Sequence, residues 1–463
     1  MAAATLELDE IQGNILAGFK SDFAGFLLFT LSGEAQMARA WLADVIADVS
    51  TTDEVQTFND LFRLRRSLGE ERPQASWMNL ALTQSGLRAL GVGETDLDQM
   101  PQEFQQGMRA RAELIGDTGN NAPESWPNGL GSASIHALVI IAADDAGERN
   151  AKVVEYVRRA RAHGATCVFS QSGRKRRDMP GYEHFGYRDG ISQPAVAGFD
   201  GPPKPGQVQP GEFVLGYPRE PETGNAPAVV ESDSNPSWLA NGSFLVFRRL
   251  RQDVRAFDEF VRDAAGEPAN EELFRAKVVG RYRSGAPLMS PGNASEDQTV
   301  ARAGAAAADP MNDFTYGGDP GGDVVPRAAH IRKTYPRDQP LPGDNAQRRR
   351  ILRRGIPFGE PYASTAPADS HNGATAERGL CFVCYQRSIA DQFEHVQREW
   401  MNTDSYPEAN DGIDPVSAAE ANRYWRMSAA DTPIELATWV WTTAGEYFFA
   451  PSIAAMKQFA RVG

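Results

Sequence analysis

The order of strands and helices expected from the sequence predicts an α+β protein made of two ferredoxin-like domains, each an antiparallel sheet flanked by helices. In the first half, short apolar runs predict four strands, and amphipathic stretches predict two helices between them. The strands are expected at 25–31, 77–83, 135–142 and 166–170, and the helices at 35–49 and 146–163. Strand, helix, strand, strand, helix, strand is the order of a ferredoxin-like unit.

The second half repeats this order more loosely. Strands are expected at 243–250 and 380–386, helices at 254–265 and 390–400, and a final strand or hairpin at 439–450. Between the halves, the segment 201–238 is rich in Pro, Gly and acidic residues, which is typical of a connector. We therefore expect an N-terminal domain over 1–200, a connector over 201–238 and a C-terminal domain over 239–463.

Composition excludes several classes of protein. With 41% hydrophobic and 23% charged residues, the chain of 463 residues has the make-up of a globular protein. A formal net charge of −14 argues against nucleic acid as a partner. No apolar run approaches the ~20 residues of a membrane helix, and the N-terminus lacks the basic and apolar regions of a signal peptide. We expect a cytoplasmic protein, with export as cargo or encapsulation left open.

A carboxylate between two glycines is the most informative local feature. The segment Gly186-Tyr187-Arg188-Asp189-Gly190 sets Asp189 in a stretch whose glycines can adopt backbone angles that other residues avoid. A side chain held in this way can be aimed into a cavity. The same pattern also fits an ordinary turn with a solvated Asp.

Two later segments carry further candidate residues. The irregular stretch 284–342 contains His330, in Ala328-Ala329-His330-Ile331-Arg332-Lys333-Thr334, and long loops of this kind are usually functional or disordered. At short range follows Arg353-Arg354-Gly355-Ile356-Pro357-Phe358-Gly359. Of the other histidines, His184 precedes the glycine-flanked segment and could line the same cavity as Asp189.

In this order, the three segments resemble the haem-site signature of dye-decolourising peroxidases. The resemblance continues in Asp9–Leu16, Asn241–Arg248, Gly379–Gln386 and Tyr447–Ser452, so it spans almost the whole chain. It implies a fold of the dimeric α+β barrel type and one haem b per chain. It also implies hydrogen peroxide as the oxidant, a ferryl–radical intermediate, and dyes or phenols as one-electron donors. The oligomeric state is expected to be a monomer or a homodimer.

The resemblance implies that His330 is the proximal iron ligand. In haem peroxidases the other ring nitrogen usually donates to a carboxylate, which makes the ligand more electron-donating. By its place in the family pattern, Asp414 is the candidate for that carboxylate, with Asp391 and Glu394 as alternatives. Arg332, two residues after the ligand, is expected to contact the haem.

On the opposite side of the haem, the resemblance implies that Asp189 shuttles a proton and that Arg353 stabilises the negative oxygen. Arg354 is the rival for the second role, but Arg353 stands four residues before Pro357, as in the family motif. Leu380 and Phe382 would form the apolar wall above the iron, or pack as plain core. Because carboxyl groups titrate near pH 4, we expect the enzyme to work best in acid.

Electron transfer from bulky dyes is expected to use surface aromatic residues. Some fungal members carry a tyrosine where this chain has Phe358, so Trp400 or Tyr335 is the predicted relay. Two other functions stay open on the sequence alone. One is a haem carrier or iron-releasing protein on the same scaffold. The other is an interaction protein without haem.

Overall fold

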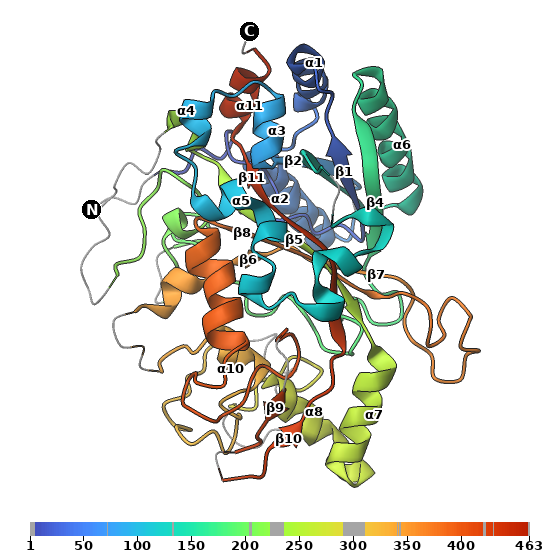
Figure 1. Ribbon diagram of the computed structural model, residues 1–463, viewed down its shortest axis with the longest axis vertical. Coiled ribbons are helices and arrows are strands. Elements are labelled where there is room, and N and C mark those ends of the chain that lie inside the picture. The colour runs from blue at the N-terminus through green and yellow to red at the C-terminus, as the bar shows by residue number, and fades with distance from the viewer. Residues whose placement is uncertain are drawn as a thin grey trace.

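The computed structural model describes residues 5–71, 73–131, 134–202, 206–222, 236–289, 311–339, 341, 344–419, 423–428 and 430–461. Of the predicted connector, residues 203–205 and 223–235 lie outside the described residues. In the part of the chain that is described, one nine-stranded antiparallel sheet runs through both halves, and helices cover it (Figure 1).

The first half has the predicted ferredoxin-like order. Its strands are β1 (Phe23–Thr30), β2 (Ser76–Leu82), β3 (Ala137–Ala143) and β4 (Thr166–Arg174), and they lie side by side as β4-β1-β3-β2. The predicted helices are α1 (Ala35–Ile46) and α6 (Ala146–Ala162). All seven residues of β3 are buried, as expected for a continuous apolar run in the middle of a sheet.

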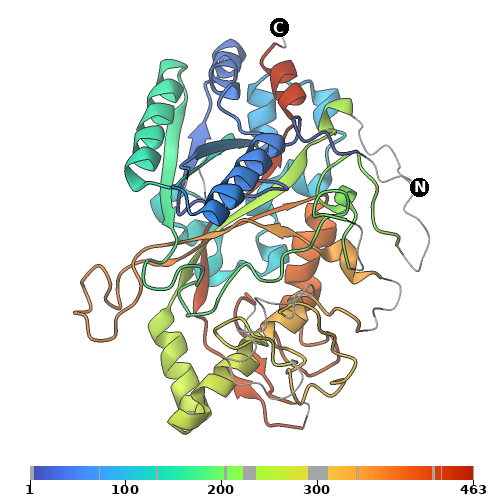
Figure 2. The same cartoon turned by 180° about the vertical axis from the view of Figure 1, so that it is seen from behind.

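Further helices in this half were not predicted. They are α2 (Thr52–Leu68), α3 (Gln84–Ala89), α4 (Glu94–Leu97) and α5 (Gln102–Ala110). The first of them crosses the face of the sheet that is turned toward the viewer in Figure 2. It begins at a capping box, in which Glu54 N–H donates to the Thr51 hydroxyl and Thr51 N–H donates to the Glu54 carboxylate.

The second half repeats the strand order. Its strands are β5 (Ser243–Gln252), β6 (Leu352–Arg353), β7 (Ile356–Phe358), β8 (Gly379–Gln386) and β11 (Val440–Ala450). The spatial order is β11-β5-β8-β6, with β7 also paired to β8. The predicted helix at 254–265 is α7 (Val254–Ala265). The helix predicted at 390–400 forms as two π-helical stretches, η9 (Ile389–Glu394) and η10 (Val396–Met401).

The remaining elements are short. They are α8 (Glu271–Val279), α10 (His330–Thr334), β9 (Tyr424–Trp425), β10 (Ile434–Glu435) and α11 (Ile453–Phe459). Single 3₁₀ turns occur as η1 (Glu113–Ile115), η2 (Gly119–Asn121), η3 (Pro123–Ser125), η4 (Pro127–Gly129), η5 (Pro210–Glu212), η6 (Ser237–Leu239), η7 (Pro268–Asn270) and η8 (Ala346–Arg349). No helix among the described residues is both long and apolar enough to cross a bilayer.

The two halves join edge to edge. Strand β11 pairs with β2 at Phe449 and Leu82. At the opposite edges, Gly173 of β4 packs against the Ile356 side chain of β7, which brings the ends of the sheet together as in a barrel. The predicted α+β fold is confirmed. The division at 201–238 stays a prediction, since strands of both halves share one sheet.

A second apolar cluster at the end of the sheet anchors the glycine-flanked segment. The Phe185 ring lies 4.5 Å from the ring of Phe257 in α7, and Tyr187 packs on the same ring at 6.4 Å. Trp439 also packs against Phe257, edge to face, with the ring centres 5.4 Å apart. Phe185 and Tyr187 therefore anchor in the core the segment that carries Asp189.

Candidate active site

The short helix α10 carries His330 and is held by a buried ion pair and by hydrogen bonds. Arg332 is fully buried and donates to the Asp319 carboxylate at 3.1 Å and to the Val325 carbonyl at 2.7 Å. Lys333 is also fully buried and donates to the Thr403 carbonyl at 2.6 Å. One turn of helix would be unstable alone, so these contacts set the position of His330.

The structure does not bring Arg332 to the haem-site cavity, in contrast to the prediction. Its Nη atoms bond to Asp319 and Val325, and its Nε donates to Gln339 Oε1 at 3.1 Å. The residue is not among those that line the cavity described below. Burial of a guanidinium is favourable only when such partners are supplied. Arg332 therefore anchors the loop that bears His330.

His330 forms the predicted pair with Asp414. Its Nδ1 lies 2.8 Å from Asp414 Oδ2, and the other oxygen of this carboxylate accepts from the N–H groups of Val416 and Ser417, both at 2.8 Å. The Asp414 side chain is fully buried. Burial opposes its ionisation, but the charge and hydrogen bond of His330 outweigh burial and lower its pKa. Because a carboxylate accepts at Nδ1, the ring presents Nε2 to a ligand.

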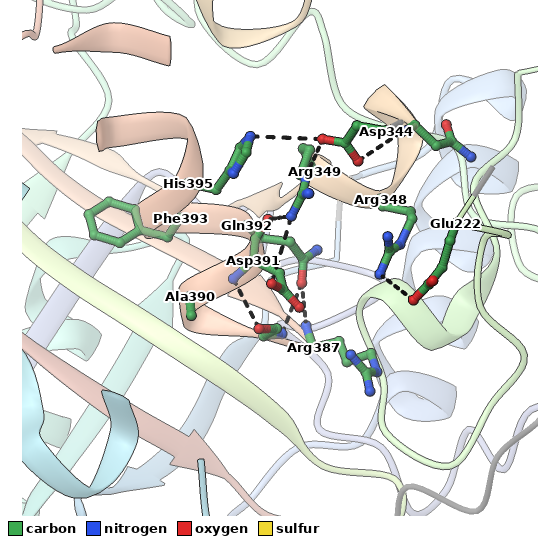
Figure 3. A network of polar contacts seen from close by, with 12 residues as sticks. Glu222, Asp344, Arg348, Arg349, Arg387, Ala390, Asp391, Gln392, Phe393 and His395 are labelled. Carbon is green, nitrogen blue, oxygen red and sulfur yellow. Dashed lines mark hydrogen bonds and ion pairs between the residues drawn. The ribbon is translucent and has the colours of Figure 1, made fainter. Parts of the chain in front are cut away.

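The two alternative carboxylates lie elsewhere. Asp391 is exposed and belongs to a network with Arg349, Asp344 and His395 (Figure 3). Glu394 is buried and accepts from Arg111 at 2.5 and 2.6 Å and from the Tyr447 hydroxyl at 2.9 Å. Neither makes a hydrogen bond to His330 in the described part of the chain, so Asp414 is the partner.

Asp189 and Arg353 meet although 164 residues separate them in sequence. Arg353 Nη1 donates to Asp189 Oδ1 at 2.8 Å, and Gly190 N–H donates to the same oxygen at 2.6 Å. Gly186 and Gly190 have positive φ angles of 91° and 79°, the conformation for which glycine was expected here. Gln193 holds the backbone of Arg353 by accepting from its N–H and donating to its carbonyl, at 3.2 and 2.8 Å.

The charge of Arg353 decides the ionisation of Asp189. Burial by itself would raise the pKa of this carboxyl, but the guanidinium charge and hydrogen bond bring it below its usual range. Arg354 has a different role. It donates to the carbonyls of Asn14, Ile15 and Leu16, each at 2.8 Å, and so ties the N-terminal segment to the sheet.

One cavity of about 310 Å³ joins these groups. His330, Asp189 and Arg353 line it, as do Leu380 and Phe382 of β8. Leu380 and Phe382 point to the same side because they are two residues apart on a strand. The predicted ligand, shuttle, cation and apolar wall therefore face a common space.

The other candidate residues are placed as follows. Tyr335 lines the cavity, is partly exposed and has the Arg350 guanidinium 3.9 Å from its ring centre. Trp400 is only 3% exposed and stacks on Tyr406 at 5.3 Å. His184 is buried outside the cavity, and its Nε2 lies 2.8 Å from the Phe358 carbonyl oxygen.

Sequence reasoning missed the residues that orient these groups. Gln193 and the N–H groups of Val416 and Ser417 fix Arg353 and Asp414, but amide side chains and backbone donors have no sequence signature of their own. A carboxylate at Glu183 also lines the cavity. The sequence shows that Glu183 lies two residues before Phe185, but it contains no signal that distinguishes a cavity glutamate from one on the surface.

The donor set fits a haem. A neutral imidazole whose Nδ1 is fixed by a carboxylate is the usual axial ligand of peroxidase iron, and the apolar side chains of Leu380 and Phe382 suit a flat macrocycle. An arginine and a carboxylate lie ready for peroxide on another wall of the same cavity. Fold and site together define a haem-peroxidase type of centre on an α+β sheet.

Comparison with known proteins agrees with this interpretation of the fold and the site. Residues 10–177 match the family model described as the DyP dimeric alpha+beta barrel domain, and residues 216–424 match the Dyp-type peroxidase, C-terminal model. The chain belongs to the Dyp-type peroxidase family, and it is a peroxidase.

Its relatives match over nearly their full length. Peroxidase 2 of Mycetinis scorodonius is 32% identical over 98% of this chain and 88% of its own length. The structure of an ancestral D-type dye decolorizing peroxidase is 31% identical, with a TM-score of 0.82 over 99% of this chain and all of that one. A dye-decolorizing peroxidase solved in complex with 2,6-dimethoxyphenol is 28% identical, with a TM-score of 0.80 over 98% of this chain and all of that one.

A deferrochelatase of Yersinia pestis also matches, at 28% identity, but only over 45% of this chain and 40% of its own length.

Proposed function

We propose that this protein holds one haem b per chain in the cavity and uses hydrogen peroxide to oxidise dyes, phenols and similar one-electron donors. The observation that carries the proposal is the convergence of His330, Asp189 and Arg353 on one cavity from three separate segments. The relative bound to 2,6-dimethoxyphenol supports phenols as one class of donor. The cytoplasmic location and the monomeric or dimeric state stay predictions.

Each residue has a defined task in this proposal. His330 holds the iron through Nε2, and Asp414 keeps its ring in one tautomer and orientation. When bound, the haem supplies the redox chemistry of peroxide cleavage. Asp189, kept ionised by Arg353, accepts a proton from one peroxide oxygen and returns it to the other. The Arg353 guanidinium stabilises the negative charge that develops as the O–O bond breaks.

Small and large electron donors are expected to reach the site by different routes. A cavity of about 310 Å³ that must also hold a haem is too small for a large dye beside it. Electrons from large dyes therefore pass through the protein. Tyr335 lines the cavity and is partly exposed, whereas Trp400 is buried and stacks on Tyr406. We assign the relay to these two aromatic residues, with Tyr335 as the one in contact with the site.

A second candidate function is a haem carrier or iron-releasing protein on the same scaffold, which the partial match to a deferrochelatase favours. Such a protein would need His330 but would gain nothing from the Arg353–Asp189 pair. The presence of that hydrogen-bonded pair at 2.8 Å favours the peroxidase.

One spectroscopic titration tests the proposal. The haem-loaded protein is mixed with one equivalent of peroxide, and the absorption spectrum is followed before and after addition of a phenol. We expect a high-spin ferric spectrum, rapid conversion to an oxidised form and return of the starting spectrum with two equivalents of phenol. Haem binding with a peroxide reaction no faster than that of an Arg353→Leu variant would favour the carrier.

A further inference from the structure

A second carboxylic acid shares the cavity with Asp189. Glu183 lines the same space and lies six residues before Asp189 in the chain. Its Oε2 accepts from Phe185 N–H at 2.9 Å and from the Gln252 side chain at 2.6 Å, and its Oε1 accepts from Tyr187 N–H at 2.8 Å. These bonds fix Glu183 at the base of the glycine-flanked segment.

The two carboxylic acids have opposite environments. Asp189 is paired with the Arg353 guanidinium, whereas all the donors to the Glu183 carboxyl are neutral, and among the described residues it forms no ion pair. Burial raises the pKa of Glu183 and the nearby Asp189 charge adds to that shift, while the hydrogen bonds to the carboxyl oppose it without reversing it. The pKa of Asp189 is lowered. Two acids whose pKa values are pushed apart in this way serve as base and acid.

The reaction itself requires protons from outside the cavity. Reduction of peroxide follows H₂O₂ + 2e⁻ + 2H⁺ → 2H₂O, so each turnover consumes two protons. Asp189 can move a proton from one peroxide oxygen to the other, but that transfer brings in none. A phenol that enters the site can supply a proton with each electron. A donor that gives electrons only, or gives them at the protein surface, supplies no proton to the cavity.

We propose that Glu183 is the proton store of this cavity, neutral at rest, and that it donates its proton to the oxygen that leaves as water. With each electron, one carboxyl O–H bond of Glu183 breaks and one O–H bond of the second water molecule forms, so two such steps supply the two protons of a turnover. Solvent then reprotonates the carboxylate. The inference rests on the proposed peroxidase function. The geometry suits it because Oε1 accepts a single hydrogen bond and can carry a proton.

The surroundings allow the proton to be replaced. Arg188 and Gly190, in the same segment, are exposed, so this wall of the cavity borders solvent. Arg176 donates to the backbone carbonyl of Glu183. The charged and titratable side chains that share the cavity with Glu183 are Asp189, His330, Tyr187, Tyr335, Arg188, Arg248, Arg281, Arg337, Arg349, Arg350 and Arg353.

Infrared spectroscopy tests the resting state directly. The difference spectrum between the wild-type protein and Glu183→Gln at neutral pH should contain the C=O band of a protonated carboxyl that shifts in D₂O. Glu212→Gln is the matched control, because burial raises the pKa of that carboxyl to about 7 but it lies outside the cavity. Absence of the band assigned to Glu183 would mean that the residue is ionised at rest, and the proposal would be wrong.

The rates of reaction with peroxide and of return to the resting enzyme test whether Glu183 supplies the protons. Glu183→Gln should react with the first equivalent of peroxide within about threefold of the wild-type rate. Its return to the resting enzyme with hexacyanoferrate(II), which gives electrons only, should slow roughly 10²-fold, while its return with a phenol should change little. Equal slowing with both donors, or none with either, would overturn the proposal.

Two further measurements distinguish loss of the ionisable group from a failure to fold. In the variant Glu183→Gln/Gln252→Glu the ionisable group lies on the other side of the same hydrogen bond, so part of the hexacyanoferrate(II) rate should return. If Glu183→Gln fails to fold, the protonation state of Glu183 in the resting enzyme can be followed in the wild-type protein. Its carboxyl C=O band should be present at neutral pH and disappear as the pH rises. Failure of the peroxidase function would show differently, as a wild-type protein that does not react with peroxide at all.

Discussion

Two carboxylates at the site have hydrogen bonds of equal length and opposite roles. Asp414 bonds to His330 and Asp189 to Arg353, each at 2.8 Å. The Asp414 side chain is fully buried and its second oxygen is taken by two backbone N–H groups, whereas the Asp189 side chain is 35% exposed toward the cavity. A carboxylate with both oxygens bonded inside the protein holds a ring in place. One that is still open can exchange a proton.

The largest expected effect comes from removing the ring that Asp414 holds. His330→Ala should lose haem, or bind it with altered ligation, because no other side chain in the described residues presents an imidazole to this cavity. Haem content and the absorption spectrum measure this, with His395→Ala as the control outside the cavity. An unchanged spectrum would exclude His330 as the ligand.

The next largest effect is expected at Arg353, the partner of the partly exposed Asp189. Arg353→Leu should keep its haem and react with peroxide about 10³-fold more slowly, because the charge on the departing oxygen loses its stabilising cation. Stopped-flow rates per bound haem measure this. Arg354→Leu is the matched control, since the adjacent guanidinium bonds to the N-terminal segment instead. Near-native turnover by Arg353→Leu would count against the assignment.

The pH dependence separates Asp189 from Arg353. Because Arg353 lowers the pKa of Asp189, the carboxylate stays ionised in mild acid, and the peroxide rate should fall only as pH drops through that lowered pKa. Asp189→Asn should lose about 10²-fold in acid and less at higher pH, where solvent base can take the peroxide proton. A small loss that is uniform with pH would mean that Arg353 alone supports cleavage.

A smaller effect is expected from Asp414, the buried partner of His330. Asp414→Asn should retain haem but lose roughly tenfold in activity, since the carboxylate acts through the ligand and not on peroxide. The iron–histidine stretching frequency of the reduced protein should fall. If that frequency did not change, the hydrogen bond would not tune the ligand.

The smallest effect concerns the donor. Tyr335→Phe should lower dye oxidation by a few-fold and leave oxidation of small phenols unchanged, because only large donors need the relay. Trp400→Phe tests the second, buried residue of the assigned relay in the same way. Equal loss for both donor sizes would place the effect in the cavity and not in a relay.

The parts that local pattern determines could be predicted from the sequence. Helix α7 runs over the predicted residues, and β8 differs from its prediction by one residue, because an amphipathic helix and an apolar strand are local signals. Helix α2 was missed although its capping box at Thr51 and Glu54 was readable. Of the residues that the family resemblance singled out, Asp189, Arg353 and His330 line one cavity, and Asp414 bonds to His330.

Long-range contacts could not be predicted in the same way. Arg332 was expected at the haem, but the fold of residues 311–334 supplies Asp319 and the Val325 carbonyl, and a buried guanidinium takes the partners nearest to it. The single pairing of Phe449 with Leu82, which joins the two halves, depends on how the completed sheets meet. Likewise, only the folded loop shows that Glu183 faces the same cavity as Asp189.

The crystal structure of the haem-loaded protein tests the central claim most directly. We predict iron bound by His330 Nε2, with Asp414 on the other ring nitrogen and with Asp189 and Arg353 across the opposite face of the porphyrin. Iron held by any other residue, or Asp189 and Arg353 on the same face as His330, would contradict the account.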